Sequence, residues 1–290
     1  MTDRAAEGRH RPAPGRRWEE SYSFDFAASD GSVGGYVRLG LRPGYGDGVA
    51  WYWAAFVSGR PGPHPSLVLV RDHDVPLPRG RTLEVRTSGL WADHTCETPL
   101  EHWTVGVEAF GVALDDPGEA FAGERGDRCP LGLDLEWEAS EPARPGRDES
   151  GGHDGYEQPC IVHGEVLVGS ERLELDGVGW RTHRWGDVDW WSGHRRAWAG
   201  GHPEPGNVDD GAPFATTDVD VVTADGGLIV AATLAGAGLD LSATPLAHAP
   251  VAIPGPGGKV SRLDRALCRY QSADGRLAVG WVEALTIPPA

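Results

Sequence analysis

The segment GVGWRTHRWGDVDWW, residues 177–191, decides how the rest of this sequence is interpreted. It holds four of the chain's 12 tryptophans, together with one histidine, two arginines and two aspartates. Aromatic rings offer apolar contact area and stabilise cations, while histidine and aspartate carry protons. We therefore expect a functional site in this segment.

The chain on both sides of this segment alternates apolar and polar residues with the period of a β-strand. In residues 18–26, WEESYSFDF, the aromatic residues share one face, and Glu20 is the acidic exception on that face. Helical periodicity is scarce, and 42 glycines and 23 prolines separate short elements. We expect an all-β protein, with further strands at residues 35–41, 49–57, 66–70, 82–86, 88–91, 102–114, 131–138, 160–168, 172–175, 214–223, 227–235, 259–270 and 276–285.

A change of composition divides the chain into two β-rich halves. Residues 140–155, SEPARPGRDESGGHDG, contain no large apolar side chain and are dense in proline, glycine and charge. We expect a first domain at residues 18–140, a linker at 141–155 and a second domain at 156–290. Residues 1–17 are basic and rich in proline and glycine, and we expect a disordered tail there.

Charge and cysteine content exclude several classes of protein. The net charge of −17 argues against nucleic acid and against anionic membrane surfaces. No apolar run approaches the length of a membrane span, and the N-terminus lacks the apolar segment of a secretory signal. Because the four cysteines lie far apart and form no C-x-x-C pair, we expect reduced thiols in a cytoplasmic protein.

Four short motifs carry a resemblance to a known family. They are YEQ at residues 156–158, HGEV at 163–166, LDGVG at 175–179 and HRWG at 183–186. Together they resemble the C-terminal signature of bacterial proteins related to carotenoid 1,2-hydratase and AttH. That group is similar in fold to kievitone hydratase and to lipocalin-like Diels–Alderases. The resemblance implies two consecutive lipocalin-like β-barrel domains.

The resemblance also implies positions for the site. In the hydratases of this group, a His-x-Trp pair and a carboxylate lie in the cavity, and the matching residues here are His183 and Trp185. The acidic residue that often precedes the histidine is replaced by Thr182. We therefore expect the catalytic carboxylate to be Asp187 or Asp189, with Asp218 and Asp220 as more distant candidates.

The residue types in the central segment suit acid catalysis on a carbon–carbon double bond. A carboxylic acid or a protonated histidine in a dry pocket can protonate an alkene, and aromatic faces stabilise the resulting cation. We expect a cofactor-independent enzyme that hydrates, isomerises or cyclises an apolar isoprenoid- or polyketide-like molecule. The alternative is a non-catalytic carrier of such a ligand. The residues expected to bind it are Glu157, Trp180, Arg181, Trp185, Trp190 and Trp191.

Strand geometry places part of this set on one face. Residues two apart in a strand point to the same side, so Arg181, His183 and Trp185 should share a face. Because an unpaired buried charge is costly, Arg181 should pair with Asp187 or Asp189. The competing interpretation is structural: the tryptophans close the barrel, and the arginines and aspartates form an ion-pair network.

The histidines do not predict a metal centre. His94 and His102 flank Cys96 and Glu97 without a third ligand at regular spacing, and His183, His194 and His202 lack close His-x-His spacing. We expect neither a metal nor a cofactor.

Overall fold

The computed structural model describes residues 2–15, 17–123, 125–146, 153–192, 196–204, 212–236 and 239–287. Within these ranges the chain forms 19 β-strands and no α-helix. Three short 3-10 helices are also present: η1 (Arg4–Glu7), η2 (Pro117–Phe121) and η3 (Pro256–Gly258). The expected all-β class is confirmed.

The first sheet closes on itself. Its strands pair in the antiparallel order β4-β3-β2-β1-β11-β10-β8-β7-β6-β5, and β4 also pairs with β7, so that eight strands form a ring. An eight-stranded antiparallel ring is the architecture of a lipocalin-type barrel. The strands are β1 (Trp18–Ala28), β2 (Val33–Arg42), β3 (Val49–Ser58), β4 (Leu67–Pro76), β5 (Val85–Thr87), β6 (Leu90–Thr98), β7 (His102–Leu114), β8 (Asp127–Ala139), β9 (Arg144–Pro145), β10 (His153–Val168) and β11 (Glu171–Asp187).

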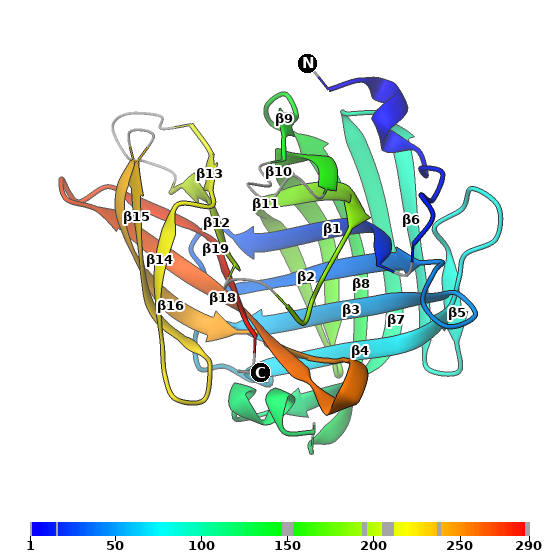
Figure 1. The fold of residues 1–290 in the computed structure, drawn as a ribbon. Coiled ribbons are helices and arrows are strands. Elements are labelled where there is room, and N and C mark those ends of the chain that lie inside the picture. Colours follow the sequence, from blue (N-terminus) through cyan, green and yellow to red (C-terminus); the bar gives the residue numbers. More distant parts are fainter. Residues whose placement is uncertain are drawn as a thin grey trace.

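The second sheet follows in the chain and curls beside the first (Figure 1). Its order is β13-β12-β19-β18-β16-β15-β14, with β17 paired to β18. The expected pair of consecutive lipocalin-like units is confirmed. The strands are β12 (Arg196–Pro203), β13 (Phe214–Thr216), β14 (Val219–Thr223), β15 (Ile229–Gly236), β16 (Leu239–His248), β17 (Val251–Pro254), β18 (Val260–Ser272) and β19 (Leu277–Thr286).

The change from one sheet to the other corrects the boundary expected from composition. Strands β10 and β11, expected in the second domain, pair with β8 and β1 and complete the first sheet. The sheets therefore change between β11 and β12, and not within residues 141–155. The polar residues 140–146 lead from β8 into the short strand β9, so their composition marks an exposed connection inside one sheet. Residues 147–152 lie outside the described part of the chain.

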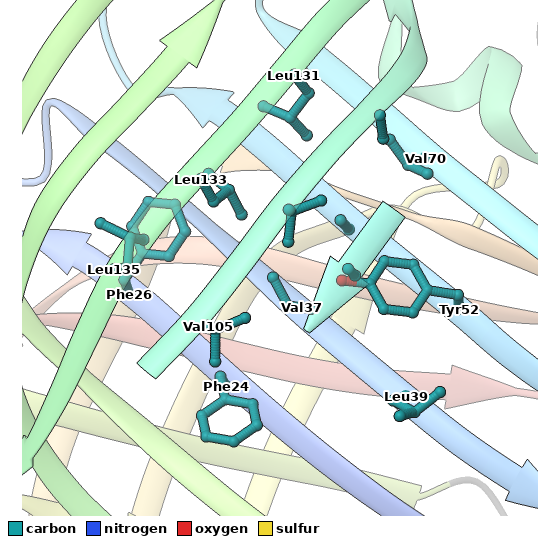
Figure 2. Packing of buried hydrophobic residues seen from close by; sticks show 14 of the residues in the cluster. Phe24, Phe26, Val37, Leu39, Tyr52, Val70, Val105, Leu131, Leu133 and Leu135 are labelled. Atoms are coloured by element: carbon teal, nitrogen blue, oxygen red, sulfur yellow. The ribbon is translucent and has the colours of Figure 1, made fainter. Parts of the chain in front are cut away.

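Two apolar cores use opposite faces of β1, β2 and β3. One fills the first barrel, and Figure 2 shows Phe24, Leu39, Tyr52, Val105 and Leu133 directed into it from different strands. The other lies between the two sheets and contains seven buried tryptophans, at positions 51, 53, 180, 190, 191, 198 and 281. Because both faces are covered, residues 49–57 read as one nearly continuous apolar run.

The N-terminal residues are part of the fold, and the expectation of a disordered tail is wrong for residues 2–15 and 17. Arg4–Glu7 forms η1, and the Glu7 side chain is buried. Arg9 donates hydrogen bonds to the carbonyl groups of Pro78 and Gly80. The segment is polar because it binds through charged side chains, which a composition argument cannot distinguish from disorder.

The four cysteines, Cys96, Cys129, Cys160 and Cys268, are free thiols, and the last three are buried. None of the helices in the described ranges is long and apolar enough to cross a membrane.

Candidate functional site

The central segment supplies strand β11, whose neighbours determine what its side chains meet. In register, His183 lies opposite Tyr22 of β1 and Tyr156 of β10, and Arg181 lies opposite Phe24 and Gln158. Alternation directs these side chains to the inner face of the first barrel, where Tyr22 and Phe24 belong to the core.

A buried carboxylate meets His183 on this face. The Nε2 atom of His183 lies 3.0 Å from Oε1 of Glu20, and the Tyr22 hydroxyl donates to the same oxygen over 3.1 Å. The His183 ring stacks on Tyr22 with a centroid distance of 4.0 Å. His10, from the N-terminal segment, places Nδ1 2.8 Å from the same oxygen and stacks on Trp185. Glu20 is therefore held by three aromatic side chains.

The protonation states follow from burial and partners. Burial alone would raise the pKa of Glu20, but hydrogen bonds from His183 and His10 outweigh it and hold that pKa below its usual range. Burial lowers the pKa of His183 despite the opposing hydrogen bond to Glu20. At neutral pH the pair is therefore an ionised carboxylate and a neutral imidazole.

The neutral His183 presents a free basic nitrogen. Because Nε2 faces the Glu20 carboxylate, that nitrogen carries the proton, and Nδ1 has the lone pair. Nδ1 is buried and has no hydrogen-bond partner among the described residues. A general base has this arrangement: a carboxylate holds the protonated ring nitrogen, and the other ring nitrogen is free to accept a proton.

A second polar group lies beside this pair. The Arg181 guanidinium forms two bonds to Glu7, of 2.8 and 3.1 Å, and also donates to Gln158. The Tyr156 hydroxyl and the Trp103 indole donate to the same Glu7 carboxylate. Burial would raise the pKa of Glu7, but the charge of Arg181 together with the hydrogen bonds from Arg181, Tyr156 and the Leu100 backbone lowers that pKa below its usual range. This ion pair joins the N-terminal segment to β11.

The structure separates the two groups of residues expected at the site. Arg181, His183 and Trp185 share a face of β11, as alternation predicts. Asp187 and Asp189 instead pair with Arg17, at 2.9 and 2.8 Å, on a solvent-exposed edge. The pair expected between Arg181 and either aspartate is wrong, because Glu7 reaches Arg181 from the other end of the chain.

The remaining expected residues lie on the other side of the sheet. Trp180, Trp190 and Trp191 belong to the core between the sheets. Glu157 is buried and accepts a hydrogen bond of 3.1 Å from the Trp198 indole. Trp185 alone of the expected tryptophans contacts the His183 ring, at 4.9 Å between centroids.

Glu7, His10, Glu20, Tyr22 and Tyr156 are site residues that the sequence did not identify. One of them left a signal, since Glu20 is the acidic exception on the aromatic face of residues 18–26. A charge at an in-facing strand position is costly without a partner, so that exception could have been interpreted as a site residue.

His10, Glu20 and His183 also have the composition of a metal site. Their ligand atoms lie within 4.8 Å of one another. Two histidines and one carboxylate would suit zinc or iron. The hydrogen bonds to Glu20 account for the same spacing without a cation.

Two other buried histidines contact backbone carbonyl groups. His94 lies near the Leu83 carbonyl at 3.4 Å, and His202 bonds the Gly179 carbonyl at 3.0 Å. Burial lowers the pKa of each to about 4. His194 lies outside the described residues.

Comparison with known proteins now places the chain. Residues 3–208 match the family model described as Domain of unknown function (DUF7064). The chain belongs to this family. Among curated proteins, no sequence matches the chain.

Several solved structures share the fold. A protein assigned as AttH from Nitrosomonas europaea is 13% identical, with a TM-score of 0.56 and coverage of 92% of both chains. Kievitone hydratase from Nectria haematococca is 11% identical, with a TM-score of 0.53, covering 92% of this chain and 88% of that one. CghA, solved with Sch210972, is 12% identical, with a TM-score of 0.51, covering 96% and 93%. The resemblance inferred from the sequence is confirmed for the fold.

Proposed function

We propose that this protein is a cofactor-independent enzyme that moves a proton on an apolar small molecule containing a carbon–carbon double bond. The reaction is hydration, isomerisation or cyclisation of an isoprenoid- or polyketide-like substrate. Glu20 and His183 are the proton-transfer pair. The observation that carries the proposal is the buried, unpartnered Nδ1 of His183, fixed from behind by Glu20.

The chemistry follows from the neutral imidazole. Nδ1 takes a proton from the carbon next to the double bond, and the electron pair of that C–H bond shifts the double bond by one position. The imidazolium, stabilised by Glu20, then returns a proton to the carbon of the original double bond that lies farther from the deprotonated carbon. In hydration, Nδ1 takes a proton from water while the water oxygen bonds to one alkene carbon, and the imidazolium then gives that proton to the other alkene carbon. In cyclisation, Nδ1 takes a proton from a carbon next to one double bond, the electron pair of that C–H bond forms a bond to one carbon of a second double bond, and the imidazolium returns the proton to the other carbon of that second double bond.

Two further observations support this assignment. Aromatic rings of Tyr22, Tyr156 and Trp185 surround His183 and would stabilise the imidazolium that forms when Nδ1 takes a proton. The similar structures include one named a hydratase and one solved with Sch210972. A carrier would need only an apolar lining, whereas a buried histidine–carboxylate pair on the inner face of the barrel favours an enzyme.

Solvent deuterium tests the proposal. The protein is incubated in D2O with a panel of terpenoid and polyketide-type alkenes, and deuterium in the alkenes is measured by mass spectrometry. We expect incorporation with the wild type, a loss of at least 100-fold in His183→Ala and Glu20→Gln, on the scale of general acid–base catalysis, and no loss in His163→Gln. His163 is a half-exposed histidine paired with Glu136 and serves as the matched control.

Binding of an alkene without incorporation would support the carrier instead. Equal incorporation by His183→Ala and the wild type would reject the proposed pair. Repeating the assay after chelator treatment distinguishes a metal at His10, Glu20 and His183, since the proposed mechanism predicts unchanged incorporation.

A further inference from the structure

A second polar group lies on the opposite face of β1, between the two sheets. Glu19 precedes Glu20 and therefore points away from His183. It pairs with Arg38 and, at 3.2 Å, with Nε of Arg42, and it accepts a 3.0 Å hydrogen bond from the Trp190 indole. Arg42 is completely buried.

Aromatic rings enclose both guanidinium groups. The Arg42 guanidinium carbon lies 3.9 Å from the ring centroid of Trp51, 4.6 Å from that of Tyr45 and 5.3 Å from that of Trp191. The Arg38 guanidinium lies over Trp53 and Trp190 at 4.7 and 5.1 Å. The aromatic faces attract the guanidinium cations, but they accept no conventional hydrogen bond from the guanidinium N–H groups.

Several buried donors in this group have no acceptor among the described residues. They are Nη1 and Nη2 of Arg42, Nη1 of Arg38 and the Trp51 indole nitrogen. A buried donor without an acceptor is costly, and a charged donor more so. Such a set is expected where a ligand supplies the missing acceptors.

The charges in the group are also unbalanced. Two arginines face one carboxylate, Glu19, which leaves one positive charge. The centroid of the His73 ring lies 4.6 Å from that of Trp51, and burial with Arg71 nearby lowers the pKa of His73 to about 3, so it is neutral. One bound anion of single charge would balance the group.

Two glycines leave the space that these side chains occupy. A Cβ on Gly40 would lie 2.6 Å from Nη1 of Arg38, and a Cβ on Gly255 would lie 2.2 Å from the Trp191 indole nitrogen. Arg38, Gly40 and Arg42 alternate along β2 and so share a face. The absence of a side chain at Gly40 allows the two arginines to lie on the same surface.

We propose that this group is a binding site for a small-molecule carboxylate with a flat apolar body. The carboxylate accepts hydrogen bonds from the two terminal nitrogens of Arg42, with Arg38 and Trp51 beside it. The body lies against Trp191 and Tyr45, which is only partly buried and marks the edge of the group. The site is separate from the Glu20–His183 pair and does not depend on its function.

The test uses the full chain and pairs of ligands that differ in charge. Acetate, benzoate and 1-naphthoate, with the matching neutral amides, are titrated by calorimetry and tryptophan fluorescence. We expect 1-naphthoate to bind at least ten-fold more tightly than 1-naphthamide. Arg42→Met should weaken naphthoate binding at least ten-fold, Arg42→Lys should weaken it less, and Arg60→Met should leave it unchanged. Arg60 is an exposed arginine paired with Asp30.

A variant with a smaller change covers the case in which Arg42→Met does not fold. Trp51→Phe keeps an aromatic ring and removes only the indole donor, and we expect it to weaken naphthoate binding several-fold. The proposal is overturned if the carboxylates do not bind to the wild type or bind no better than the amides. It is also overturned if the folded variants bind naphthoate as the wild type does.

Discussion

Glu19 and Glu20 are adjacent in the sequence, yet the two faces of β1 give them different chemistry. Glu19 meets Arg38 and Arg42, whose charges are permanent at any physiological pH. Glu20 meets His183, His10 and Tyr22, and of these the His183 imidazole is the group proposed to exchange protons. A carboxylate with fixed cations anchors structure or balances charge, whereas one with titratable partners can support proton transfer. The two proposals, ligand binding at the Glu19 face and proton transfer at the Glu20 face, rest on this difference.

The largest contrast should appear in stability. Glu19→Gln leaves two buried arginines without a counter-charge and should lower the free energy of unfolding by about 3–5 kcal/mol. Glu20→Gln keeps a side-chain oxygen that can still accept hydrogen bonds from Tyr22 and His183, and it should cost about 1–2 kcal/mol. Urea unfolding of both variants measures this. Equal costs would mean that the two faces do not differ as described.

Among the contacts of the N-terminal segment, the buried Glu7–Arg181 ion pair should contribute most to its attachment. Glu7→Ala leaves Arg181 buried and unpaired and should cost about 3 kcal/mol. It should also make the N-terminal segment more sensitive to limited proteolysis, because the segment loses the buried ion pair between Glu7 and Arg181. Glu101→Ala removes the exposed pair with Arg4 and is the control, with no expected change. Unchanged proteolysis in Glu7→Ala would show that other contacts hold the segment.

The pH dependence of stability should differ between the faces. Because the folded-state pKa of His183 is lowered, the unfolded chain binds more protons, so stability falls as pH drops below about 6.5. His183→Gln should therefore flatten the stability curve between pH 7 and 5, and Arg42→Met should not. The buried His73, His94 and His202 act in the same direction, and Asp25, whose pKa burial raises to about 6, acts in the opposite one. Because His183→Gln and Arg42→Met both keep these groups, the comparison between the two variants isolates the contribution of His183. Parallel curves for His183→Gln and wild type would contradict the assignment.

The smallest effect is expected at the two aspartates that pair with Arg17. Asp187→Asn and Asp189→Asn each remove an ion pair with this exposed arginine, and the amide oxygen at position 189 can still accept the backbone hydrogen bonds of Trp191 and Ser192, so stability should be unchanged within error. Deuterium incorporation should also be unchanged, because neither carboxylate contacts His183. Loss of incorporation in either variant would restore an aspartate as the catalytic acid.

The features that depend on neighbouring residues, namely the strands and the faces that their side chains share, could be predicted from the sequence. Period-two alternation predicted most of the strands but not β9, β16 or β17, and the same rule placed Arg181, His183 and Trp185 on one face. It could not supply partners that topology brings together, such as Glu7 and Arg181, which are 174 positions apart. The boundary between sheets was missed for the same reason, because β10 and β11 are assigned to the first sheet only by pairing with β8 and β1.

The protonation state of His183 tests the central claim most directly. Nitrogen-15 NMR of the imidazole, followed from pH 8 to pH 5, reports both its tautomer and its pKa. The structure predicts a neutral ring at pH 7 with the proton on Nε2, a bare Nδ1 and a pKa below 6.5. A ring protonated on Nδ1, or one that is already an imidazolium at pH 7, would contradict the assignment of His183 as the base.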